Sequence, residues 1–124
     1  MKKILCADDD PTIRRIISES LQRFGYEVIL AADGAEALAR LKQDKPDLLL
    51  LDVMMPELNG YDVCFKMKFD PDLKPIPVIL LTCRDQELDS RLGVLMGIEY
   101  LHKSCSSAEL VAKVQQVLGA GNAS

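Results

Sequence analysis

Five short apolar runs, separated by amphipathic segments, restrict the folds open to this chain more than any other feature. The runs cover residues 3–7, 27–31, 47–52, 77–82 and 98–102. They read as continuous apolar stretches, which is typical of strands buried on both faces of a parallel sheet. Because these strands alternate with helical segments, we predict a doubly wound α/β fold.

The segments between the runs carry signals for helix starts and ends. Asp10 is the expected N-cap of the first helix, with Pro11 in its first turn and Gly25 as its end. A third helix is expected to begin near Asn59, and the fifth is expected to stop at Gly119. All of the amphipathic segments therefore read as helices.

The second and fifth helices begin at pairs of residues with capping-box spacing. These pairs are Asp33 with Glu36 and Ser106 with Glu109, and the helix that starts at the first pair ends before Pro46. The expected apolar faces contain Ile13, Ile16, Ile17, Leu21 and Phe24 in the first helix; Ala35, Leu38 and Leu41 in the second; Val63, Cys64 and Met67 in the third; Leu88, Leu92, Leu95 and Met96 in the fourth; and Leu110, Val114, Val117 and Leu118 in the fifth.

The length of 124 residues suits one compact domain with one hydrophobic core. Five strand–helix units fit an open sheet better than a closed barrel, which needs about 250 residues. We predict a five-stranded parallel sheet in the flavodoxin-like order 2-1-3-4-5, with five helices on both faces. The domain is assigned to residues 1–119, and residues 120–124 are expected to form a disordered tail or the start of a linker.

Composition excludes several classes of protein. No apolar run approaches the ~18 residues that a membrane span requires, and the amino terminus turns acidic where a signal peptide would stay apolar. We therefore expect a cytoplasmic protein without membrane insertion. The net charge of −4 and the pI near 4.9 argue against direct binding of nucleic acid.

The four cysteines, Cys6, Cys64, Cys83 and Cys105, form no CxxC pair, and no histidine stands at zinc-ligand spacing. Neither a disulfide framework nor a zinc site is indicated. We predict reduced cysteines that act as packing residues.

Five polar residues stand at the carboxyl ends of the expected strands. Asp8 and Asp9 follow the first strand, Asp52 ends the third, Thr82 ends the fourth and Lys103 follows the fifth. In open α/β sheets these ends form the ligand site, at the point where the strand order reverses. We predict that the fold brings the five side chains together.

Three neighbouring carboxylates repel one another by roughly 3 kcal/mol per pair and need a cation. Lys103 supplies one charge, and oxygen ligands without histidine or thiolate favour Mg²⁺. Metal, ammonium and hydroxyl groups around a carboxylate outline a phosphoryl-transfer site. Asp52 is the candidate nucleophile because it ends the most buried strand.

These motifs, "ADDD", "LLLLDVMMPELNG", "ILLT" and "YLHK", resemble the CheY-like receiver domain of two-component response regulators, from about Lys2 to Leu118. The resemblance implies that Asp52 accepts a phosphoryl group from a phosphohistidine, and that the domain is a signalling switch rather than an enzyme. It also implies that the domain promotes its own phosphorylation and dephosphorylation.

The resemblance also implies roles for the other site residues. Asp9, Asp52 and the backbone carbonyl of Met54 would bind Mg²⁺ directly, and Asp8 would act through water. Thr82 would donate a hydrogen bond to the phosphoryl group, and Lys103 would pair with it.

Tyr100 matches the aromatic switch residue, whose ring turns inward when the threonine moves toward the phosphoryl group. The alternative for Tyr100 is a half-buried strand tyrosine with a hydrated hydroxyl.

Two positions depart from the receiver pattern or bear on its kinetics. Ser104 stands where the family usually has a proline in a cis peptide, so we predict a trans peptide and a rearranged loop over residues 103–106. Met54 and Arg84 occupy the positions that tune phosphoryl lifetime in the family. Neither side chain would readily orient an attacking water, so slow self-dephosphorylation is expected.

Other functions fit the residues less well. A phosphatase of the haloacid dehalogenase type would need an aspartate where Met54 stands, and the acidic residues 8–10 would repel a flavin phosphate. The remaining alternative is a receiver-like interaction module that works without phosphorylation, and only Ser104 favours it.

The resemblance implies partners of two kinds. A sensor histidine kinase or a histidine phosphotransfer protein would contact the first helix. A downstream protein target or effector domain would contact the fourth helix, the fifth strand and the fifth helix. We expect a monomer that could dimerise on phosphorylation.

Overall fold

The computed structural model describes residues 1–55, 58–82, 99–103 and 105–121 of the chain. These residues form one sheet of five parallel strands in the order β2-β1-β3-β4-β5, which confirms the predicted topology. The elements are β1 (Lys3–Ala7), α1 (Pro11–Gln22), β2 (Glu27–Ala31), α2 (Gly34–Asp44), β3 (Leu48–Asp52), α3 (Gly60–Lys68), β4 (Val78–Thr82), β5 (Glu99–His102) and α5 (Ser107–Gly121).

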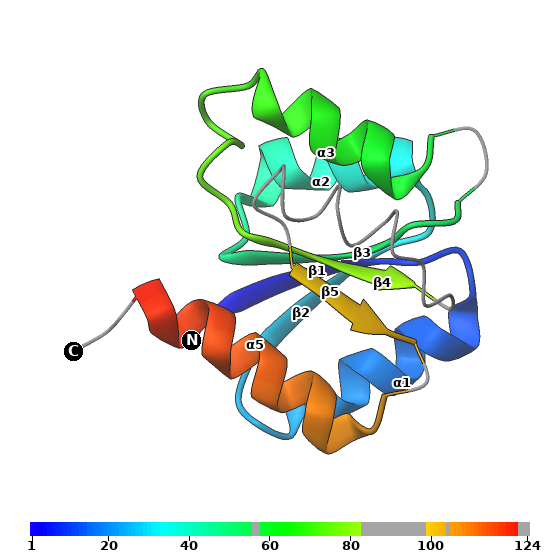
Figure 1. Cartoon of the computed structure of the whole chain (residues 1–124), viewed down its shortest axis with the longest axis vertical. Coiled ribbons are helices and arrows are strands. Elements are labelled where there is room, and N and C mark those ends of the chain that lie inside the picture. Colours follow the sequence, from blue (N-terminus) through cyan, green and yellow to red (C-terminus); the bar gives the residue numbers. More distant parts are fainter. Residues whose placement is uncertain (56–57, 83–98, 104, 122–124) are drawn as a thin grey trace.

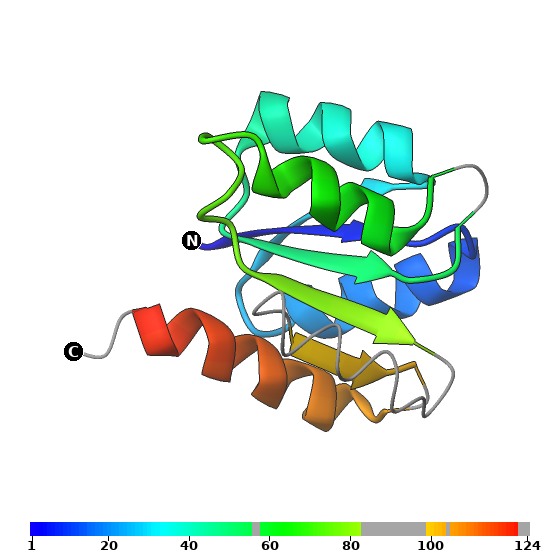
Figure 2. The same ribbon diagram turned by 45° about the horizontal axis from the view of Figure 1, so that its top comes forward.

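Helices cover both faces of the sheet (Figure 1). Helices α2 and α3 lie on one face, and α1 and α5 lie on the other, as the tilted view in Figure 2 also shows. The predicted fourth helix, with Leu88, Leu92, Leu95 and Met96, lies outside the described residues. Within the ranges that are described, no helix combines the length and apolar character that crossing a bilayer requires.

The central strand β3 explains the continuous leucine run, because all of its residues are buried. Successive side chains of a strand point to opposite faces, so each face of β3 faces a different layer of helices. The α2/α3 cluster includes Leu49, Leu51, Leu80, Leu41, Val63 and Met67. The α1/α5 cluster includes Leu48, Leu50, Leu81, Ile17, Leu21 and Val114. Each fully buried leucine contributes about 1.5–3 kcal/mol relative to exposure.

The predicted helix caps are present. The Asp10 carboxylate accepts from the Thr12 N–H, and the Asp33 carboxylate accepts from the Glu36 N–H at 2.8 Å. The Ser106 hydroxyl accepts from the Glu109 N–H, and the Glu109 carboxylate accepts from the Ser106 N–H, which completes the capping box of α5. The Glu36 carboxylate instead accepts from Ala32, one residue before the cap.

Several residues of the predicted apolar faces are exposed. Ile16 is 48% exposed because Ile17 and Leu21 carry the inward stripe of α1, and Ile16 lies at its margin. Phe24 is 59% exposed because α1 ends two residues earlier, so Phe24 no longer follows the helical track. In α2 the buried alanine is Ala37, and Ala35 faces solvent.

The carboxyl-terminal helix is longer than predicted. Its hydrogen-bonded backbone continues to Gly121, past the predicted stop at Gly119, because neither glycine nor the alanine between them prevents a helical backbone. Residues 122–124 of the predicted tail lie outside the described residues.

Three described cysteines carry free thiols: Cys6, Cys64 and Cys105. Burial raises the pKa of the Cys6 thiol to about 12, with a further contribution from the Asp8 charge, and burial alone raises that of Cys64 to about 12. A thiol that stays protonated is a weak nucleophile, so these two act as packing residues, as predicted. Cys83 lies outside the described residues.

Candidate functional site

The carboxyl ends of the parallel strands meet at one edge of the sheet, toward which the arrows in Figure 2 point. Asp8 directly follows β1, Asp52 is the last residue of β3, and Thr82 is the last residue of β4. Lys103 follows β5, and its N–H donates to the Thr82 carbonyl at 2.7 Å. The sheet therefore delivers side chains from nearly the whole chain to one place.

The predicted acidic cluster is present at this edge. One carboxylate oxygen each from Asp8, Asp9 and Asp52 lie within 4.8 Å of one another. Asp8 and Asp52 are buried, whereas Asp9 is exposed. The Lys103 Nζ lies 3.1 Å from Asp8 Oδ2 and 3.0 Å from Asp52 Oδ2. The ammonium thus bridges the two buried carboxylates.

Backbone groups orient both buried carboxylates. The Asp10 N–H donates to Asp8 Oδ1 at 2.9 Å, and the Met54 N–H donates to Asp52 Oδ1 at 3.1 Å. The Asp8 N–H donates to the Ala31 carbonyl, which ties the end of β1 to β2. In each carboxylate, Oδ1 is therefore held by the backbone, and Oδ2 faces Lys103.

Arg14 also contacts this edge, and the sequence analysis did not identify it. Its guanidinium donates to the Asp8 carbonyl at 2.6 Å. Arg14 lies on α1, six residues after Asp8, and because Asp8 precedes the helix, no helical spacing could have suggested this contact. The contact steadies the β1–α1 turn that carries the acidic pair.

The electrostatics of the cluster follow from burial. Burial raises the pKa of Asp52 to about 6; the hydrogen bond from Lys103 opposes this rise, and the Asp8 charge adds to it. Burial lowers the pKa of Lys103, but its hydrogen bonds to Asp52 and Asp8 outweigh burial, so its pKa is raised. Lys103 therefore stays an ammonium at neutral pH, and Asp52 is mostly a carboxylate.

The charges of the cluster do not balance. Three carboxylates and one ammonium, all ionised, leave a net charge of −2. The Oδ2 atoms of Asp8 and Asp52 are buried and face Lys103 at ion-pair distance, and among the described residues they have no other hydrogen-bond donor. Buried carboxylate oxygens that share a single ammonium group favour the binding of an additional cation. The donor set fits a hard divalent ion.

The remaining predicted residues lie on the strands and turns that carry this cluster. Thr82 is half-buried and pairs with His102 in the register of β4 and β5. The Met54 side chain is exposed, and its backbone adjoins Asp52. Tyr100 is half-buried on β5, and its hydroxyl lies 2.9 Å from the Tyr61 hydroxyl. The switch role of Tyr100 and its alternative, a half-buried strand tyrosine with a hydrated hydroxyl, both stay predictions.

Ser104 and Arg84 lie outside the described residues, so the trans peptide after Lys103 and the slow dephosphorylation stay predictions.

Gly60 controls the approach of α3 to the site. A Cβ at this position would lie 2.6 Å from the Asp52 carbonyl oxygen, and the Gly60 N–H donates to the Val53 carbonyl at 3.0 Å. The Asn59 and Asp62 side chains cap the first turn of α3 in a reciprocal capping box. The start of α3 therefore packs directly against the backbone of Asp52 and Val53 at the end of β3.

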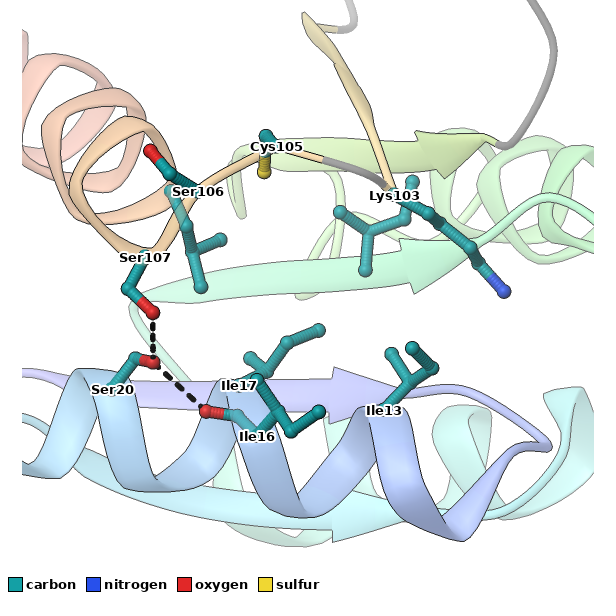
Figure 3. A pocket seen from close by; sticks show the side chains of 10 residues that line it. Ile13, Ile16, Ile17, Ser20, Lys103, Cys105, Ser106 and Ser107 are labelled. Carbon is teal, nitrogen blue, oxygen red and sulfur yellow. Dashed lines mark hydrogen bonds between the residues drawn. The ribbon is translucent and has the colours of Figure 1, made fainter.

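A cavity of about 190 Å³ opens next to the cluster, between α1 and the start of α5. Figure 3 shows Lys103 at the opposite end of this cavity from Ser107, with Ile13, Ile16 and Ile17 along α1. The Ser20 hydroxyl donates to the Ile16 carbonyl and lies 2.9 Å from the Ser107 hydroxyl. This bond joins α1 to α5 at the end of the cavity opposite Lys103.

Together, the doubly wound sheet and the lysine-bridged acidic cluster at its edge match the arrangement expected of a receiver domain. A model of the response regulator receiver domain matches residues 4–115, so the chain belongs to the receiver domain family. This agrees with the resemblance seen in its motifs.

Curated relatives of this chain are transcriptional regulators. The alkaline phosphatase synthesis transcriptional regulatory protein PhoP of Bacillus subtilis is 41% identical over 118 residues, which cover 94% of this chain and 48% of that protein. The transcriptional regulatory protein CpxR of Klebsiella pneumoniae is 44% identical over 119 residues, covering 95% and 50%. The chain therefore spans about half the length of these relatives.

Solved receiver structures share the fold. The chemotaxis protein CheY4 of Vibrio cholerae has a TM-score of 0.88 at 33% identity, covering 94% of this chain and 98% of that chain. The BeF3-activated N-terminal receiver domain of Klebsiella pneumoniae RstA has a TM-score of 0.85 at 30% identity, covering 94% and 97%.

Proposed function

We propose that this domain is a phosphorylation switch in which Asp52 accepts a phosphoryl group from a phosphohistidine of a sensor histidine kinase or a histidine phosphotransfer protein. The observation that carries the proposal is the buried Asp52 carboxylate, held by the Met54 N–H and placed 3.0 Å from Lys103. A rigid carboxylate beside a fixed ammonium suits in-line attack on phosphorus.

In the proposed reaction, an Asp52 oxygen forms the new bond to phosphorus while the bond from phosphorus to the imidazole nitrogen breaks, and the electron pair stays on the imidazole. Lys103 pairs with the charge of the transferred group, and the Thr82 hydroxyl donates a hydrogen bond to it.

Mg²⁺ is the proposed cofactor. Asp9, Asp52 and the Met54 carbonyl would hold the ion, with Asp8 acting through water. When bound, it supplies positive charge that neutralises the phosphoryl oxygens. The unbalanced charge of the cluster supports this assignment.

The proposed output is a change in partner binding, transmitted through Thr82 and Tyr100. The domain would promote its own phosphorylation and its slow dephosphorylation at Asp52. Because relatives of about twice this length are named as transcriptional regulators, an effector domain or a separate downstream protein is the proposed recipient of the signal.

Intact mass after incubation with acetyl phosphate and Mg²⁺ tests the proposal. Wild-type protein is expected to gain about 80 Da, one phosphoryl group, and Asp52→Asn is expected to gain nothing. If the wild type gains no mass while titration shows that Mg²⁺ binds, the domain works as a phosphorylation-independent interaction module instead.

A further inference from the structure

A hydrogen bond between two tyrosines connects α3 to β5. The Tyr61 and Tyr100 hydroxyl oxygens lie 2.9 Å apart, although the residues are 39 positions apart in the chain. Both side chains are half-buried and pack against the α2/α3 cluster. The Tyr100 ring therefore contacts the core.

Tyr61 is fixed by the same segment that carries Asp52. It directly follows Gly60, whose N–H donates to the Val53 carbonyl and whose Cα lies so close to the Asp52 carbonyl that no Cβ fits. A displacement of the backbone after Asp52 must therefore move the first turn of α3, and Tyr61 with it.

Tyr100 is placed next to Thr82 by the register of β4 and β5. Tyr100 pairs with Leu80, and Thr82 follows Leu80 by two residues. Residues two apart in a strand lie on one face of the sheet, so Thr82 and Tyr100 share the face that α2 and α3 cover.

We propose that Tyr61 is a positioning residue of the switch. Its hydroxyl holds the Tyr100 ring against the α2/α3 cluster. Through this contact, movement of the segment after Asp52 would reach β5 by way of Tyr61, in addition to the connection through Thr82. The proposal rests on the proposed function, in which Tyr100 reports the phosphoryl group. Because phosphorylation is expected to favour the same inward ring, the bond and the phosphoryl group would stabilise the same position of Tyr100.

Ring-labelled tyrosine in NMR tests this coupling directly, since the chain has three tyrosines and no tryptophan. Each signal is assigned with Tyr→Phe variants. In Tyr61→Phe, the Tyr100 ring signal is expected to move toward the position of an exposed tyrosine and to return when beryllofluoride and Mg²⁺ are added. The apparent affinity for beryllofluoride is expected to fall about two- to tenfold, the worth of one such hydrogen bond.

Control variants separate this role from packing alone. Tyr61→Phe keeps the ring and removes only the hydroxyl. Tyr26→Phe, on the α1/α5 side, is expected to leave both the Tyr100 signal and the affinity unchanged. Combining Tyr61→Phe with Tyr100→Phe is expected to cost no more affinity than Tyr100→Phe alone, because the second change removes the same bond.

Two outcomes contradict the proposal, and they differ. If beryllofluoride shifts the Tyr100 signal in the wild type but Tyr61→Phe changes neither that signal nor the affinity, Tyr61 has no positioning role and the proposed function stands. If beryllofluoride and Mg²⁺ shift the Tyr100 signal in neither the wild type nor Tyr61→Phe, Tyr100 is no switch, and the role of Tyr61 is lost together with that part of the proposed function.

Discussion

At the scale of single residues, the site depends on a buried charge. Asp52 is ionised at neutral pH although burial raises its pKa to about 6, and the adjacent Asp8 adds repulsion. Lys103 offsets part of this cost by contacting both carboxylates. Removing the charge while keeping the shape of the side chain should therefore stabilise the metal-free protein, at the expense of its proposed chemistry.

We predict that Asp52→Asn raises the free energy of unfolding by about 1–3 kcal/mol near pH 7.5 in EDTA. The folded protein keeps the Asp52 proton up to about pH 6, whereas an unfolded carboxyl loses it near 3.8. The folded state thus binds more protons between these values, and the wild type loses stability as the pH rises through them. Urea unfolding at several pH values measures the difference.

The advantage of the variant should shrink as the pH falls below about 6 and should nearly vanish by about pH 4. A difference that stayed constant from pH 4 to pH 8 would show that the Asp52 charge is not its cause.

At the scale of elements, the turn from β3 into α3 holds the phosphoacceptor segment. Gly60 permits this turn, because the backbone of Asp52 occupies the space of a Cβ. The apolar spacing of α3 indicates a helix but says nothing of this close approach. A second glycine, Gly119 in α5, is exposed and has no atom within 4 Å of its Cβ position among the described residues. The two glycines form a matched pair for substitution.

We predict that Gly60→Ala lowers the free energy of unfolding by about 1–3 kcal/mol, because the backbone must shift to admit the methyl group. Gly119→Ala should raise it by about 0.5–1 kcal/mol, because alanine loses less backbone entropy in a helix. Urea unfolding compares the two variants with the wild type. Destabilisation of equal size in both variants would contradict the role given to Gly60.

At the scale of the whole molecule, α1 and α5 frame a cavity whose far end is Lys103 (Figure 3). Ile16 lines this cavity and is nearly half exposed, so α1 presents an apolar side chain to solvent at this cavity, which Lys103 also lines. A partner that delivers a phosphohistidine to Asp52 must approach the edge of the sheet where the strands end. We propose that Ile16 contacts that partner.

We predict that Ile16→Ser slows phosphotransfer from a phosphohistidine partner about tenfold, the effect of losing one apolar anchor. Its phosphorylation by acetyl phosphate should stay unchanged, because the small donor needs no docking surface. Phe65→Ser, at a side chain that is 60% exposed and lies on α3, is the control and should alter neither rate. Equal slowing with both donors would place the effect of Ile16 on the site itself rather than on docking.

The sequence by itself determined the strands, their order and the convergence of Asp8, Asp9, Asp52 and Lys103, and it placed Thr82 at the end of the neighbouring strand. These follow from local patterns and from one rule, that parallel strands present their carboxyl ends at the same edge. Tertiary structure alone decided which isoleucines of α1 face the core, how far burial raises the pKa of Asp52, and that Tyr61 contacts Tyr100. Each of these depends on which distant segments pack together, and no spacing within one segment encodes that.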